Sequence, residues 1–254
     1  MLYNFEKTLL VILLSITFSC KNYNNENHYK NFAIVTAKYE ATKAGHKILK
    51  MGGNAFDAMI ATDLALSVVY PNAGNLGGGG FMVYRTSNSQ YGSIDYREKA
   101  PLLSSENMYL DKNGNIIKNL SSEGSLSIGV PGTVAGLFEV YEKFGTLPLD
   151  SIFKPALELA RDGFKLTKKQ ADLFNSSKSK ILINSDSLSL FNKNFEKDMI
   201  FSNDKLYKTL KYLLKNGVEG FYDGDISKEI INYVSKKGGC LLYTSDAADD
   251  PWSG

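Results

Sequence analysis

Residues 55–69, AFDAMIATDLALSVV, predict a helix that carries apolar side chains on nearly every face. Such a helix is stable only when other elements cover it, so the rest of the chain has to fold around it. Asn54 stands in the N-cap position, Asp57 follows three residues later to complement the positive helix end, and Pro71 ends the helix. We expect this helix to be buried against a sheet.

The stretch after the helix predicts that sheet. Four consecutive glycines at 77–80 lead into apolar residues 81–84, and a Ser/Asn/Gly turn leads into a second segment at 93–98. Two short segments joined by such a turn are typical of a β-hairpin. Helices layered on an antiparallel sheet give an α+β fold.

Further elements are expected before and after this unit. They are a strand at 33–35 and helices at 38–51, 133–144, 150–162, 167–174, 205–216 and 225–237. Residues 175–204 are polar and weakly periodic, which favours surface loops with short helical turns.

The glycine run has two interpretations. A phosphate-binding loop is excluded because no Lys-Ser/Thr pair follows and the glycines lead into a strand instead of a helix. The glycines at 77–80 form either a turn that uses positive φ angles and close backbone packing, or a loop that faces a substrate. The local sequence leaves both open.

Arg97 is the candidate binding residue of the hairpin. Asp95 and Glu98 flank it, so the first interpretation is an internal salt bridge. The second is a guanidinium fork presented to a substrate carboxylate, which arginine binds through two parallel hydrogen bonds. Asp57 and Asp63 are interpreted as cap and helix-packing residues, not as an acid/base pair.

Composition excludes several other functions. The formal net charge is only +2 and both signs are interspersed, which gives no electrostatic case for nucleic acid. Two cysteines and two histidines cannot build a Cys/His metal site, and we expect no metal or other cofactor. No Ser/His/Asp arrangement or nucleophile elbow is present in the sequence.

Both ends of the chain are unlike the middle. Residues 1–20 predict a signal peptide, whose apolar run ends at Ser19 and Cys20 and is similar to a lipoprotein lipobox, with Cys20 as the acylated residue. A plain secretory signal is the alternative. Residues 21–32 predict a polar tether. At the other end, residues 240–254 resemble a translated sequencing adapter, so we expect a non-native tail on a truncated protein. A natural tail is the alternative.

Seven motifs, taken in order, resemble the γ-glutamyltranspeptidase family. They are ATKAGHKILKMGGNAFDA at 41–58, NLGGGGFMVY at 75–84, DYREKAP at 95–101, SIGVPGTVAGL at 127–137, PALELARDGF at 155–164, GFYDGDISKEI at 220–230 and KKGG at 236–239. Each motif alone is modest, and the ordered set is specific. Residues 33–239 then correspond to part of the large subunit.

The resemblance implies a four-layer αββα N-terminal-nucleophile hydrolase fold. In that family the precursor cleaves itself, and the small subunit begins with the nucleophilic threonine. Arg97 matches the family arginine that grips the α-carboxylate of the γ-glutamyl donor. No threonine of this chain matches the nucleophile, so the chain alone is expected to be inactive.

The expected function follows from this resemblance. It is cleavage of the γ-glutamyl amide of glutathione and related compounds, with transfer to water or to an amino acid or peptide. The expected partners are these compounds and the small subunit, in the bacterial periplasm or cell envelope, with membrane contact by a lipid anchor only. The alternatives are a glutaryl-β-lactam acylase of the same fold and a non-catalytic surface lipoprotein that binds peptides or amino acids.

Overall fold

The computed structural model describes residues 31–184 and 190–241. The chain divides into two compact units, residues 1–33 and 34–254, and the fold reported below is that of the second. The predicted signal peptide with Cys20, the tether as far as residue 30, and residues 242–254 of the predicted tail lie outside the described residues.

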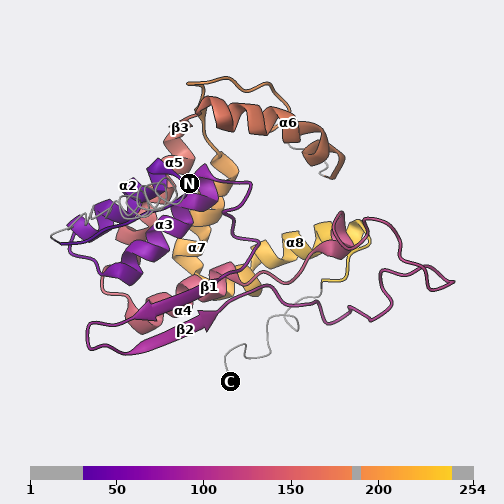
Figure 1. Cartoon of the computed structure of the whole chain (residues 1–254), viewed down its shortest axis with the longest axis horizontal. Coiled ribbons are helices and arrows are strands. Elements are labelled where there is room, and N and C mark those ends of the chain that lie inside the picture. The colour runs from indigo at the N-terminus through magenta and orange to yellow at the C-terminus, as the bar shows by residue number, and fades with distance from the viewer. Residues whose placement is uncertain (1–30, 185–189, 242–254) are drawn as a thin grey trace, which may run out of the picture. The chain divides into compact units, whose positions relative to one another are not determined.

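The described part is α+β, as predicted, with more helix than strand (Figure 1). In chain order the elements are α2 (Tyr39–Lys50), α3 (Ala55–Val69), β1 (Phe81–Arg85), β2 (Tyr91–Asp95), a 3₁₀ turn (Ser125–Ser127), α4 (Thr133–Phe144), α5 (Leu149–Asp162), β3 (Phe164–Lys165), α6 (Lys168–Asn184), β4 (Ile200–Phe201), α7 (Asp204–Tyr222) and α8 (Asp225–Lys236).

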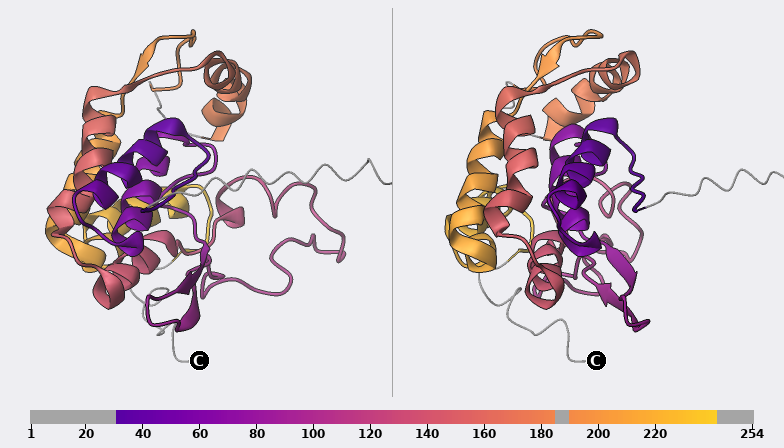
Figure 2. Two further views of the ribbon diagram at one scale, coloured as in Figure 1. Left: turned by 60° about the vertical axis from the view of Figure 1, so that its left-hand side comes forward. Right: turned by 90° about the vertical axis from the view of Figure 1, so that its left-hand side faces the viewer.

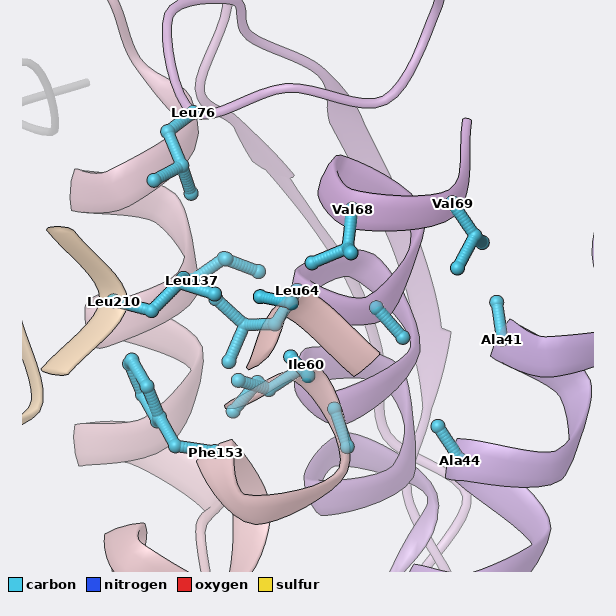
Figure 3. Packing of buried hydrophobic residues seen from close by; sticks show 14 of the residues in the cluster. Ala41, Ala44, Ile60, Leu64, Val68, Val69, Leu76, Leu137, Phe153 and Leu210 are labelled. Atoms are coloured by element: carbon cyan, nitrogen blue, oxygen red, sulfur yellow. The ribbon is translucent and has the colours of Figure 1, made fainter. Parts of the chain in front are cut away.

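Helix α3 is the centre of the hydrophobic core, which confirms its predicted burial, but the elements packed on it are mainly helices and not the predicted sheet. Ile60 and Leu64 are each only 1% exposed. Figure 3 shows these side chains directed toward Leu137 of α4 and Phe153 of α5, while α2 covers another side of the helix. Each large side chain buried in this way contributes about 1.5–3 kcal/mol.

A capping box fixes the start of α3. The Asn54 side chain accepts from the amides of Phe56 and Asp57 at 2.8 and 2.9 Å, and the Asp57 carboxylate accepts from the Asn54 amide at 2.9 Å. Asp57 is fully buried and also accepts from the Thr146 amide at 2.9 Å. Its role as a cap is confirmed, and it also holds the connection between α4 and α5.

Strands β1 and β2 form the predicted hairpin, in a register that runs from Phe81 opposite Asp95 to Arg85 opposite Tyr91. Met82 and Ile94 point into the core, whereas Phe81, Val83 and Tyr91 on the other face are 62%, 84% and 73% exposed. We call Phe81, Val83 and Tyr91 the outer face of the hairpin. Figure 2 shows the hairpin at the margin of the helices, with one side facing away from them.

Several predicted boundaries are wrong. The second strand covers 91–95 and not 93–98, because the Arg97 amide donates to the Asp95 carboxylate at 2.9 Å and not to a strand partner. No strand is assigned at 33–35, where the described residues provide no pairing partner for the backbone. Helix α6 extends to Asn184, ten residues beyond the prediction, and β3 and β4 are too short to give a periodic signal.

Candidate functional site

The segment that carries Arg97 lies between the two glycine-rich stretches of the chain. On one side, Gly80 and Tyr96 exchange both backbone hydrogen bonds, at 3.2 and 3.0 Å. On the other side, Lys99 and Val130 do the same, at 3.2 and 2.8 Å. Three motifs that are far apart in the sequence are therefore joined by main-chain bonds.

The N-terminus of α4 closes this arrangement. The Gly78 carbonyl accepts from the amides of Gly132 and Thr133 at 2.7 and 2.9 Å, which satisfies amides that a helix start leaves without a partner. The Tyr222 hydroxyl donates to the Pro131 carbonyl at 2.8 Å and accepts from the amide of the residue at 135 at 3.2 Å. Burial raises the pKa of Tyr222 to about 12.

Sequence reasoning missed Tyr222 as part of this site. The one sequence feature that could have indicated it is its motif, GFYDGD, which resembles the same family as the motif at the start of α4. Nothing in the local pattern of α7 shows that its last residue reaches the start of another helix.

Close backbone packing explains Gly79 and Gly132, but not Gly77, where a Cβ would make only ordinary contact, 3.8 Å from the Asn75 side chain. A Cβ at Gly79 would lie 2.5 Å from the Tyr96 carbonyl oxygen, and a Cβ at Gly132 would lie 2.1 Å from the same atom. Both distances are far below van der Waals contact. The expectation of positive φ in the glycine run is wrong, because the glycines with positive φ lie elsewhere, as at Gly52 and Gly163.

Arg97 projects from this packed segment into solvent. Its side chain is 67% exposed, and its Nε lies 4.0 Å from the Glu98 carboxylate, so the predicted salt bridge is a long, exposed ion pair without a hydrogen bond. Its guanidinium carbon lies 5.7 Å from the centre of the Phe81 ring. Asp95, the other flanking acid, accepts from the Arg97 backbone amide instead. The guanidinium thus remains available to a carboxylate beside the outer face of the hairpin.

Asp63 differs from Asp57. Burial raises the pKa of Asp63 to about 6, and the negative charge of Asp63 adds to the burial that raises the pKa of Tyr96 to about 12. Asp57, in contrast, accepts from the Asn54 and Thr146 amides and is fully used in the cap. The two carboxylates do not form an acid/base pair.

Other kinds of site are absent from the part of the chain that the structure describes. Residues 31–184 and 190–241 contain no group of three or more His, Cys, Asp or Glu side chains placed to hold a metal ion. The helices of these residues include none that is both long and apolar enough to cross a membrane. A cavity of about 10 Å³ between α3, α4, α5 and α7 has an entirely apolar lining and is a packing void.

Comparison with known proteins gives the family. The model of the family described as gamma-glutamyltranspeptidase matches residues 41–249, which is most of the chain. The chain belongs to the gamma-glutamyltranspeptidase family. The family match extends as far as residue 249, and Leu241 is buried against Val130 and Val234. The expectation that residues 240–254 form a non-native tail stays a prediction.

Individual relatives agree with this assignment. The glutathione hydrolase proenzyme of Pseudomonas sp. (strain A14) is 38% identical over 95% of the chain and 44% of its own length. The crystal structure of Helicobacter pylori gamma-glutamyltranspeptidase superposes with a TM-score of 0.83 at 38% identity, over 87% of this chain and 64% of that one.

The comparisons also show how much of a relative the chain spans and which likeness concerns only the fold. The chain spans 44% of the length of the Pseudomonas relative, so it corresponds to the N-terminal portion of such a protein. The cephalosporin acylase of Bacillus halodurans matches with a TM-score of 0.73 at 23% identity, over 89% of this chain and 45% of that one. At that identity the likeness concerns the fold alone.

Proposed function

We propose that this chain is the large-subunit portion of a γ-glutamyltranspeptidase precursor. The complete protein cleaves the γ-glutamyl amide of glutathione and related compounds and transfers the γ-glutamyl group to water or to an amino acid or peptide. Family membership and the relatives named as glutathione hydrolase proenzymes support this proposal. The chain alone is inactive, because it supplies only one part of the active site.

Arg97 holds the α-carboxylate of the donor. The observation that carries this role is an exposed guanidinium, without a hydrogen-bonded acid, on a backbone packed rigidly between two glycine-rich stretches. Arginine presents two parallel N–H groups to a carboxylate, and the binding is strongest when the fork is held in place.

The remainder of the precursor supplies the nucleophile. Its N-terminal threonine hydroxyl attacks the γ-carbonyl carbon, and the threonine's own α-amino group accepts the hydroxyl proton. The C–N bond then breaks, the departing amine takes up that proton, and a γ-glutamyl ester remains on the enzyme. Water or an acceptor amine attacks this ester and regenerates the threonine.

The same remainder completes a four-layer αββα sandwich. Phe81 and Val83 on the outer face of the hairpin are exposed in this chain, which supports a second sheet layer above them. A two-stranded hairpin with one apolar face uncovered is marginal by itself. Covering this face also brings the added sheet next to Arg97.

Export is the proposed localisation. The N-terminal sequence supports a lipid anchor at Cys20 that holds the protein in the bacterial cell envelope, with the enzyme on the outer side of the cytoplasmic membrane. Cys20→Ala is expected to release the mature protein from the membrane fraction. Continued membrane retention of this variant would contradict the lipid anchor.

Expression of the complete precursor tests the proposed activity. It is expected to cleave itself into two chains and to release glutamate from glutathione, while residues 1–254 alone release none. A precursor that stays uncleaved, or that binds amino acids without releasing glutamate, would favour the non-catalytic binding protein. Release of glutaryl groups from a β-lactam, with no action on glutathione, would favour the acylase.

A further inference from the structure

The ring of Tyr96 lies in a slot formed by two glycines. A Cβ at Gly80 would lie 2.7 Å from ring atom Cε2 of Tyr96, and a Cβ at Gly136 would lie 2.3 Å from ring atom Cγ. Tyr96 is only 7% exposed. Any larger residue at either glycine would therefore displace the ring.

The backbone of Tyr96 is held as firmly as its ring. Its amide and carbonyl pair with Gly80, and its carbonyl oxygen lies where a Cβ of Gly132 would be. The next residue is Arg97, whose Cα would lie 2.7 Å from a Cβ at Gly79. The Tyr96 ring and the base of the Arg97 side chain therefore belong to one closely packed unit.

We propose that Tyr96 is a positioning residue, whose ring sets the place from which the Arg97 guanidinium meets the carboxylate of its ligand. This inference rests on the proposed function, in which Arg97 binds that carboxylate. A two-point contact between guanidinium and carboxylate is lost when the fork is misplaced by about 1 Å, so a rigid support beneath Arg97 has a direct effect on affinity.

The positioning role belongs to the ring of Tyr96 and not to its hydroxyl. Within residues 31–184 and 190–241 the Tyr96 hydroxyl makes no described hydrogen bond, whereas its ring carbons fill the slot. Burial, with a smaller effect of the Asp63 charge, raises the pKa of the Tyr96 phenol further above neutral pH, where the hydroxyl is protonated in any case. Tyr96→Phe should therefore retain the positioning, and Tyr96→Ala should lose it.

Calorimetric titration of the complete, self-cleaved protein with L-glutamate tests this inference. L-glutamate carries the relevant carboxylate and is not turned over, and the titration reports affinity separately from the fraction of competent sites. Tyr96→Ala is expected to raise the Kd at least tenfold at unchanged stoichiometry, and Tyr96→Phe to stay within twofold of the parent. Tyr39→Ala, at a tyrosine that is 72% exposed on α2, is the control.

A second pair of variants tests the slot itself. The atoms closest to a Cβ at Gly80 are all at the far end of the Tyr96 ring. Gly80→Ala should therefore weaken L-glutamate binding when residue 96 is Tyr or Phe, and add nothing when it is Ala. Gly80→Ala also provides the test if Tyr96→Ala does not fold.

The outcomes separate the two proposals. A lower stoichiometry at unchanged Kd in Tyr96→Ala or Gly80→Ala would show a merely structural role and would overturn the positioning role. If the Kd for L-glutamate is unchanged in Tyr96→Ala and Gly80→Ala but raised in Arg97→Lys, the positioning role is overturned and the proposed function stands. An unchanged Kd in Arg97→Lys would overturn the role of Arg97 and with it this inference.

Discussion

The Tyr222 hydroxyl donates a hydrogen bond of 2.8 Å to the carbonyl of Pro131, so the end of α7 is fastened to the segment that begins α4. Because the same segment bonds to Gly78 of the glycine run, Tyr222 is linked through it to the packed stretch that carries Arg97. A residue remote in sequence thus belongs to the framework of the candidate site.

Tyr222→Phe should destabilise the chain. The change removes the hydroxyl's two hydrogen bonds and leaves a half-buried carbonyl and a helix-start amide without partners, at a cost of about 1–3 kcal/mol. Urea unfolding followed by circular dichroism measures the loss. Tyr212→Phe is the matched control, since the Tyr212 hydroxyl accepts a single long bond of 3.4 Å from the Asp225 amide. Equal stability of both variants and the parent would refute the framework role.

Asp63 should make stability depend on pH in a definite direction. Burial raises the pKa of Asp63 to about 6 from an ordinary value of 3.8, so the folded chain favours the protonated carboxyl. Its contribution to stability is complete below about pH 4 and is lost as the pH rises through about 6. The difference corresponds to about 3 kcal/mol at pH 7.5.

Asp63→Asn removes this dependence and is expected to be the more stable chain at pH 7.5, with no advantage at pH 3.5. Chemical unfolding at both pH values measures the difference. Asp150→Asn, at an exposed carboxylate in the first turn of α5, is the control and should show no such gain. A gain for Asp63→Asn that is the same at both pH values would contradict the assignment.

The sequence predicted the helices well and the site only partly. An all-apolar helix such as α3 can only be buried, and its Asn54 and Asp57 cap is a local pattern, so both could be predicted. The hairpin also has a local signal. The function of its glycines does not, because their close packing depends on Tyr96 and on α4, which local sequence does not bring together.

The errors have similar physical causes. Residues 175–184 of α6 have weak periodicity, and a helix there depends on its surroundings more than on its own pattern. The strand-like neighbours of Arg97 predict a strand there, whereas in the structure the Asp95 carboxylate accepts from the Arg97 amide and the strand ends before Arg97. The role of Tyr222 has no local sequence signal, because its hydrogen bonds join segments about ninety residues apart.

The outer face of the hairpin should matter only in the complete precursor. Val83 is 84% exposed, so Val83→Lys should change the unfolding free energy of the 254-residue chain by less than about 0.5 kcal/mol. In the precursor a buried lysine at this position would oppose the added sheet layer, and the yield of self-cleaved protein should fall severalfold. Gel analysis of cleavage measures this yield.

Ile183→Lys is the control for that experiment, since Ile183 is 79% exposed on α6, which lies apart from the hairpin. It should leave self-cleavage close to the parent yield. Normal cleavage in Val83→Lys would mean that nothing covers the outer face, and the four-layer arrangement would need revision.

The KM for glutathione of Arg97→Lys in the complete protein tests the central claim most directly. Lysine keeps the charge but loses the fork, so the KM should rise more than tenfold, equivalent to about 1.4 kcal/mol. Arg85→Lys, at the exposed arginine on the same hairpin that bonds to Ser89, should leave the KM unchanged. An unchanged KM in Arg97→Lys would remove Arg97 from the donor site.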